Sequence, residues 1–311
     1  MSLPSPLLSI PTLGADQLSY RGVAFGGTGT PFNISKLDGL EQVDKRTGNT
    51  DRPRSRGAFV GLNLPKTRMI TVTHAIGPPF GSYTNLSGAA SALRTALQSD
   101  GVTEYPLWIQ LPASQGFGMV ACMARVVKTS RPWDIVADLG QLLRGAVIQF
   151  EAADPYFYTA PTLAPSVGLP TPGLGFSFPL TFNWPFGGGS TANQVTVTNT
   201  GDVPCWPVLV INGPCLNPTV QNLSIPGNPA ITLGLQLQTG DQLVIDCDMQ
   251  SILFTPNGST VAAPYPQILQ AGSTFFALPP GSSVISFNDQ STSPAAGTLA
   301  IWNASALSGL L

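Results

Sequence analysis

Three aspartates lie close together in the stretch GDQLVIDCDMQ, residues 240–250. Closely spaced carboxylates are what a metal site or a glycosidase needs. The stretch alternates apolar and polar residues, which predicts a strand with the apolar residues of 243–249 on one face. This strand is predicted to form a hairpin with the preceding apolar run 230–238, with Asp241 in the turn between them and Asp246 and Asp248 on an outward acidic face. A calcium site is the alternative, although carboxylates at i and i+2 supply too few ligands alone.

Other catalytic chemistry finds little support. His74 is the single histidine, and no GxSxG motif accompanies it, so a serine triad or a multi-histidine metal site would depend on His74 alone. The glycines of 24–32 lack the GK[ST] of a phosphate-binding loop. We therefore predict that the protein is not an enzyme and has no catalytic residues, no metal and no cofactor.

Four cysteines occur without CxxC spacing, which favours buried thiols over bridges or zinc ligands. A disulfide between the second and third of them is the minority alternative. They are Cys122, Cys205, Cys215 and Cys247.

Charge is scarce and unevenly distributed. Charged residues make up 10% of the 311 residues, against roughly 25% in an average globular protein. All fourteen Lys and Arg residues lie between Arg21 and Arg144, and the chain after residue 158 carries only five carboxylates. This shift predicts two domains with net charges of +3 and −5. A surface so poor in charge suits a protein that is largely covered by neighbouring subunits.

The predicted organisation has four parts. Residues 1–16, MSLPSPLLSIPTLGAD, are broken by prolines and lack a basic region, so we interpret them as an extended N-terminal arm and not as a signal peptide. Residues 17–158 form a β-domain with one helix, residues 159–175 a Pro/Gly-rich linker, and residues 176–311 a β-sandwich. No apolar run is long enough to span a membrane, and we expect no membrane association.

Apolar periodicity predicts the elements. In the first domain, the runs 58–64 and 68–76 alternate around Pro65 and read as a hairpin, and a helix follows within 86–101. Residues 133–143 are a possible second, short helix. The second domain is predicted to be almost wholly strands, at 176–184, 194–199, 206–212, 219–225, 230–238, 242–249, 251–254, 273–278, 283–288 and 298–304.

A basic, turn-rich run occupies residues 44–57. It lacks interleaved aromatics, which argues against specific nucleic-acid binding. One interpretation is a solvated loop without a partner. The alternative, which gives the run a function, is a loop that pairs with an acidic neighbouring subunit. Its basic residues are Lys45, Arg46, Arg52, Arg54 and Arg56.

Aromatic residues of the second domain suggest a contact surface for a glycan or a protein partner, although most aromatics are expected in the core. The candidates are Trp184, Trp206, Tyr265 and Trp302.

Several longer motifs resemble one family. The first domain contains RPRSRGAFVGL, RMITVTHAI and a strand that ends in ADPYFY before the Pro-rich segment. The second contains GDQLVIDCDMQSILF, an Asn-Gly turn and LPPGSSVISF in this order. The succession over about residues 17–306 resembles the distal tail proteins, also called Dit or tail-hub proteins, of long-tailed phages with non-contractile tails.

This resemblance implies a virion structural protein at the tail tip, assembled in the host cytoplasm. It implies a tail-tube-like N-terminal domain that forms a ring, typically of six copies, around the DNA passage, and a galectin-like or carbohydrate-module-like C-terminal sandwich. The implied partners are further copies of the chain, the tail tube protein, a tail-associated protein and receptor-binding or other minor tail proteins. Residues 44–57 would interlock neighbouring subunits, and DNA would only pass through the lumen. A free carbohydrate-binding module for adhesion to host glycans is the alternative function.

Overall fold

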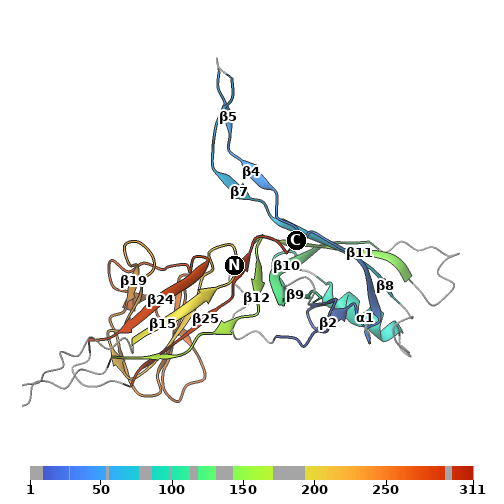
Figure 1. Ribbon diagram of the computed structural model, residues 1–311. Helices are drawn as coiled ribbons and strands as arrows, with labels where there is room; N and C mark the ends of the chain where they lie inside the picture. The colour runs from blue at the N-terminus through green and yellow to red at the C-terminus, as the bar shows by residue number, and fades with distance from the viewer. Residues whose placement is uncertain are drawn as a thin grey trace, which may run out of the picture. The chain divides into compact units, whose positions relative to one another are not determined.

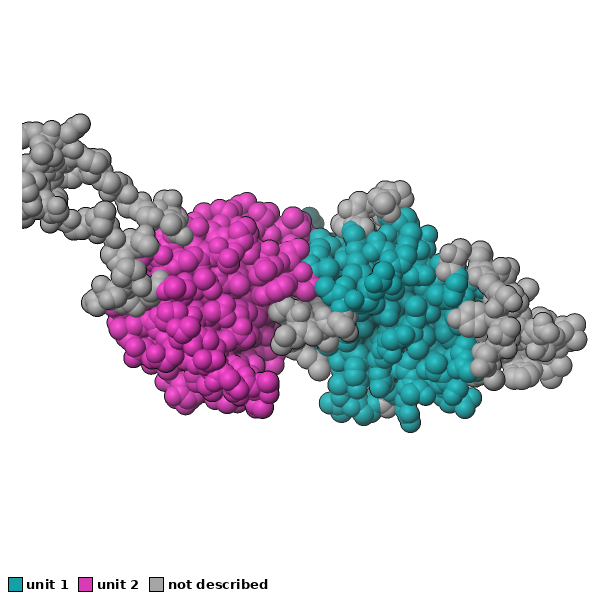
Figure 2. Space-filling model, turned by 90° about the horizontal axis from the view of Figure 1, so that it is seen from below, with its two compact units in different colours: residues 1, 3–160, 307–311 teal, residues 2, 161–306 magenta. Residues whose placement is uncertain are grey.

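The computed structural model describes residues 10–27, 29–53, 56–76, 86–98, 100–112, 118–130, 143–170, 193–290 and 296–310. The chain divides into two compact units, coloured separately in Figure 2. The first runs to Ala160 and includes the C-terminal segment from Leu307, and the second is Pro161–Ala306. Both consist mainly of antiparallel strands, which confirms the predicted fold class.

The first unit is built on a sheet with the strand order β2-β1-β9-β10-β11-β8-β3 (Figure 1). Strand β8 matches the predicted run 68–76, in which apolar and polar residues alternate. The elements are β1 Gln17–Tyr20, β2 Val23–Phe25, β3 Phe32–Asp38, β8 Arg68–Ile76, α1 Leu86–Ala96, β9 Tyr105–Gln110, β10 Met119–Ser130, β11 Leu143–Ala152 and β12 Phe157–Thr159.

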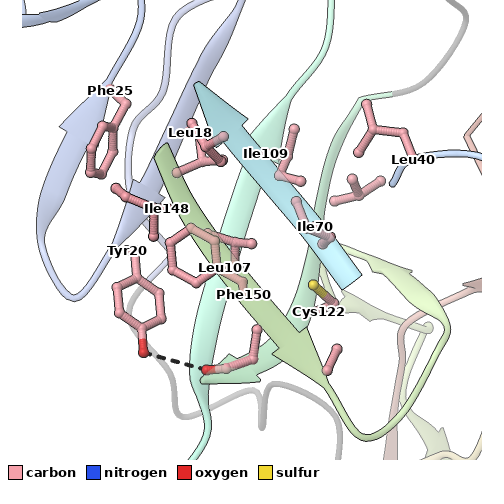
Figure 3. Close-up of a cluster of buried hydrophobic side chains, with 14 of the residues drawn as sticks. Leu18, Tyr20, Phe25, Leu40, Ile70, Leu107, Ile109, Cys122, Ile148 and Phe150 are labelled. Atoms are coloured by element: carbon pink, nitrogen blue, oxygen red, sulfur yellow. Dashed lines mark hydrogen bonds between the residues drawn. The ribbon is translucent and has the colours of Figure 1, made fainter. Parts of the chain in front are cut away.

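The core of this unit gathers the inward residues of these strands. Tyr20 and Phe150 meet edge to face with 4.9 Å between ring centroids, and the Tyr20 hydroxyl donates to the carbonyl oxygen of Ala124 at 3.4 Å. Figure 3 shows them among buried aliphatic side chains. Burial raises the pKa of Tyr20 to about 12, so the phenol stays protonated.

The predicted helix is α1, which buries Leu93 and Ala96 on one face. Its C-terminal carbonyls are satisfied by a side chain from outside the helix. Arg21 donates to the carbonyl oxygens of Ala96 at 3.3 Å and Gln98 at 2.7 Å, and its guanidinium lies 4.4 Å from the ring centroid of Tyr105. This contact ties the end of α1 to the sheet.

The predicted hairpin of residues 58–64 with 68–76 is wrong. Strand β8 pairs with β3 and β11, whereas the 58–65 run pairs back with residues 45–51. The short strands are β4 Lys45–Thr47, β5 Thr50–Asp51, β6 Ala58–Phe59 and β7 Asn63–Pro65. Because residues 45–51 contain no apolar residue, periodicity alone could not identify them as the partner strand.

The second unit contains two main sheets, with the orders β13-β25-β16-β21-β22-β23 and β15-β24-β18-β19. Buried residues of both sheets, such as Leu209, Ile245 and Phe287, are fully shielded from solvent. The elements are β13 Thr162–Leu163, β14 Val167–Gly168, β15 Gln194–Asn199, β16 Val208–Asn212, β17 Cys215–Leu216, β18 Thr219–Asn222, β19 Ala230–Thr232, β20 Gln236–Leu237, β21 Gln242–Asp246, β22 Ser251–Thr255, β23 Ala263–Pro264, the 3-10 helix Pro266–Ile268, β24 Gly281–Asn288 and β25 Thr298–Asn303. The predicted strand 273–278 does not form beyond a single bridge at Leu278.

The domain boundaries differ from the prediction. Within the predicted linker 159–175, β13 and β14 pair with β25, so these residues belong to the second unit. Prolines interrupt the apolar pattern there, but they are compatible with short edge strands. At the other end, β26 (Ala306–Leu307) leads the chain back into the first unit, where Leu310 is buried and its N–H donates to the carbonyl oxygen of Leu40 at 2.8 Å. The strand 176–184 lies outside the described residues, as does the possible helix 133–143 except for Leu143, which begins β11.

Candidate interaction surfaces

Residues 44–53 and 56–66 form a narrow two-stranded arm within the first unit (Figure 1). Its strands are held by the pairs β4–β7 and β5–β6, and its base is closed by the Lys66 N–H, which donates to the carbonyl oxygen of Asp44 at 2.9 Å. Between the two pairs, the Gly61 N–H donates to the side-chain oxygen of Asn49 at 3.0 Å. The predicted interlocking loop 44–57 is therefore one strand and the tip of a longer hairpin.

The arm is basic along one strand and apolar along the other. Lys45, Arg46, Arg52 and Arg56 are exposed, and none of them forms an ion pair within the described part of the chain; Arg54 lies outside it. The Arg52 guanidinium lies 5.0 Å from the ring centroid of Phe59. The returning strand exposes large apolar side chains, with exposed fractions of 59% for Phe59, 88% for Val60, 74% for Leu62 and 40% for Leu64.

Sequence reasoning missed this exposed apolar strand, because the run 58–64 was interpreted as one half of a hairpin with 68–76. The sequence did contain a signal for the exposure of this strand. The apolar side chains of AFVGLNL (58–64) could be buried only against another apolar strand, and residues 44–57 contain none. A contiguous exposed apolar surface on a thin hairpin is typical of a protein contact.

Arg68 anchors the base of the arm. It is 2% exposed, and its guanidinium donates to four carbonyl oxygens, those of Pro155 at 2.6 Å and Gly39, Glu41 and Ser308 at 2.7 Å each. Its guanidinium also lies 4.2 Å from the ring centroid of Phe157, and burial lowers its pKa. Because Gly39 and Glu41 lead into the arm and Ser308 belongs to the C-terminal segment, one side chain joins these parts of the first unit.

The stretch 240–250 contains two turns, each built on an aspartate. Asp241 is buried and accepts hydrogen bonds from the N–H groups of Gln238 at 2.7 Å and Asn257 at 2.8 Å. Gly240 beside it has φ +91°, which glycine adopts without strain. The predicted turn is therefore confirmed, but β20 and β21 on either side of it do not pair with each other.

Strand β21 instead pairs with β16 and β22. Asp246 ends β21, and its carboxylate accepts from the N–H groups of Asp248 at 2.9 Å and Met249 at 3.0 Å, closing the turn to β22. Leu243, Ile245 and Cys247 are buried as predicted. Met249 was predicted on the same face but is 52% exposed, because the strand has already ended. The half-buried Asp246 carboxylate thus closes this turn, to which the half-buried Asp248 contributes its backbone N–H.

Replacing Asp241 with Ala is expected to lower the free energy of unfolding of the second unit by about 2 kcal/mol, since two buried N–H groups lose their acceptor. Replacing Asp246 with Ala serves as the comparison and should cost less, about 1 kcal/mol, because water can reach its half-buried turn. Urea denaturation of both variants measures the difference. Equal losses would contradict the assignment of Asp241 as the more strongly buried acceptor.

The predicted aromatic surface does not gather at one place. Trp302 on β25 pairs with Val208 and Leu163, and Trp206 lies two residues before Val208 at the same end of the sheet. Tyr265 follows β23, with its ring 5.7 Å from that of Phe254. Three intervening strand spacings of about 4.8 Å separate β25 from β22, so Tyr265 and Trp302 cannot stack on one sugar ring. Trp184 lies outside the described residues.

The single histidine is packed among aromatic rings. His74 is buried, with its ring 5.6 Å from Phe25 and 6.2 Å from Phe32. No group of three or more His, Cys, Asp or Glu residues placed to hold a metal ion occurs in the described ranges. None of the helices in these ranges is long and apolar enough to cross a membrane.

All four cysteines are free thiols, as predicted, and burial raises the pKa of each to about 12. They therefore stay protonated at neutral pH and are poor nucleophiles.

Comparison with known proteins locates the relationship in the second unit. Residues 200–302 match the family model of SPP1 Dit, described as the C-terminal domain of siphovirus-type tail components. This match confirms the resemblance to distal tail proteins. The matched residues include Asp246 on β21 and Trp302 on β25.

Solved structures extend the similarity of fold to both units. The crystal structure of SPP1 Dit, described as a hub of the adsorption apparatus in phages that infect Gram-positive bacteria, has a TM-score of 0.61 at 13% identity, covering 94% of this chain and 99% of that one. A chain of the phage P2 baseplate in its activated conformation with calcium has a TM-score of 0.56 at 10% identity, covering 94% of this chain and 98% of that one. A chain of the same baseplate in its activated conformation with strontium has a TM-score of 0.54 at 11% identity, covering 92% and 98%. The comparison with curated proteins found no match.

Proposed function

We propose that this protein is a distal tail protein, which forms a ring at the tip of a long non-contractile phage tail. The family match over residues 200–302 carries the proposal. The similarity of fold over nearly the whole chain supports it, since both units occur in one Dit chain of comparable extent. The ring joins the tail tube to the tip or baseplate and to host-recognition proteins.

The proposed setting is the virion, after assembly in the host cytoplasm. The ring consists of identical subunits, six by analogy with the family, and contacts the tube protein, a tail-associated protein and receptor-binding or other minor tail proteins. DNA passes through its lumen without specific binding. The proposed role involves no catalysis and no cofactor, which is consistent with the carboxylates of Asp241 and Asp246 accepting hydrogen bonds within turns.

The arm is the proposed lock between neighbouring subunits. Its exposed basic strand has no anionic partner in the described part of its own chain, whereas the second unit contains five carboxylates and no Lys or Arg. A ring needs such heterologous contacts, in which two different surfaces of the same chain meet. Charge then favours the correct partner, and the apolar strand supplies buried area.

Mass photometry of the purified protein and cryo-microscopy of the particles test the ring. The variant Arg52→Glu, Arg54→Glu, Arg56→Glu is expected to weaken assembly about tenfold at low salt and less at 0.5 M NaCl, where charge is screened. Lys128→Glu, an exposed charge reversal on β10, is the matched control and should assemble normally.

Two results would contradict these proposals. Unchanged assembly of the triple variant would remove the basic strand from the contact. A protein that stays monomeric at high concentration and binds glycans would instead favour the alternative function of a carbohydrate-binding module.

A further inference from the structure

An open groove of about 870 Å³ runs through the first unit beside β3. One wall is formed by the consecutive residues 33–37, and the other by residues 14–18 and by 109–112 at the end of β9. Side chains of consecutive strand residues point to alternate faces, so a groove that touches all five follows the edge of β3. Its apolar lining comes from Ile34, Leu37 and Leu40 with Leu18, Ile109 and Leu111.

Strand β3 is the last strand of its sheet and pairs only with β8 among the described residues. Its other edge faces the groove. The Lys36–Asp38 ion pair, at 2.7 Å, protects the C-terminal end of this edge, and a bulge interrupts the ladder between Ile34 and Lys36. The half around Asn33 and Ile34 carries no charge.

The chain itself supplies a segment with matching chemistry. Residues 1–9, MSLPSPLLS, lie outside the described residues and are uncharged in their side chains. In an extended strand, the N–H groups of successive residues point to opposite edges. Pro4 and Pro6 therefore remove donors from one edge only, while Leu3, Ser5 and Leu7 keep theirs on the other. Such a strand can pair along a single edge, as an edge strand must.

We propose that residues 1–9 dock in this groove of their own chain as an additional edge strand on β3. The described chain begins at Ile10, four residues before Gly14 on the groove wall, which is enough for a short reversing loop. Five extended residues span about 17 Å, the length of the 33–37 wall. Intramolecular attachment gives an effective concentration in the millimolar range, so weak pairing suffices.

The docked segment covers an edge that would otherwise pair with other chains. An uncovered strand edge promotes edge-to-edge association, and the Lys36–Asp38 ion pair protects only the C-terminal end of this one. The segment thus keeps a free subunit from mispairing, whatever larger assembly the protein enters.

Two proline substitutions in the full-length chain test the pairing. Ser5→Pro removes an N–H from the pairing edge, whereas Ser2→Pro adds a third proline to the edge that already lacks donors. Hydrogen exchange of those amides within residues 33–37 that point away from β8 is expected to accelerate at least tenfold in Ser5→Pro and to stay unchanged in Ser2→Pro. Equal exchange in both variants would overturn the proposal.

A second measurement uses a chain that lacks residues 1–9 and a fluorescent peptide of residues 1–10. Saturable binding is expected, weakened at least tenfold by Leu37→Ser in the groove and unaffected by Val102→Ser, an exposed residue outside it. Absence of binding would contradict the proposal. Protection of β3 in the full chain that rises with protein concentration would also contradict it, since the occupant would then come from a second copy.

Discussion

Replacing Arg68 with Ala is expected to lower the free energy of unfolding of the first unit by about 4 kcal/mol. Four carbonyl oxygens would lose their donor at one site, and the removed side chain would leave a cavity beside Phe157. Arg68→Lys should recover only part of the loss, because one ammonium group cannot reproduce the planar fork of the guanidinium.

Urea denaturation followed by tryptophan fluorescence measures this loss, with exchange of the β9 amides around the buried Trp108 as the local readout. Lys128→Ala, an exposed cation of the same unit, is the control and should change the free energy of unfolding by less than about 0.5 kcal/mol. A loss below about 1 kcal/mol in Arg68→Ala would show that water replaces the guanidinium, and Arg68 would not be the anchor of the arm.

The double variant Phe59→Ser, Leu62→Ser is expected to weaken subunit association about 100-fold or more while leaving the folded subunit intact. Both side chains are more than half exposed in the isolated chain, so folding gains little from them. Burial of each against a neighbour contributes about 1.5 kcal/mol or more, and 1.4 kcal/mol corresponds to a factor of ten in affinity.

Mass photometry over a concentration series gives the association constants, and circular dichroism verifies the fold. Val102→Ser with Val127→Ser is the matched control, because it removes comparable exposed apolar surface from outside the arm. Assembly equal to that of the unmodified protein would mean that the apolar strand of the arm contributes nothing to the contact. The effect should persist at high salt, in contrast to that of the arginine reversals, since salt does not screen apolar burial.

The sequence predicted local structure well where each strand has its own alternation. Strands β8 and β15 agree with the predicted ranges, and the helix falls within the predicted stretch. Pairing was predicted less well. The apolar strand of the arm and the strand that starts at Gln242 were each assigned to a neighbouring run in sequence, but both pair elsewhere. Alternation fixes which side a residue faces, while the partner depends on contacts between distant segments.

The sequence alone determined the β-rich class, the two-part charge distribution, the turn role of Asp241 and the resemblance to tail-hub proteins. These depend on composition, local periodicity and motif order, which can be observed without three-dimensional contacts. Only the tertiary structure revealed the apolar strand of the arm, the four carbonyls around Arg68 and the groove beside β3. Each of these brings together residues far apart in the chain, as Arg68 and Ser308 are, and such contacts leave no period in the sequence.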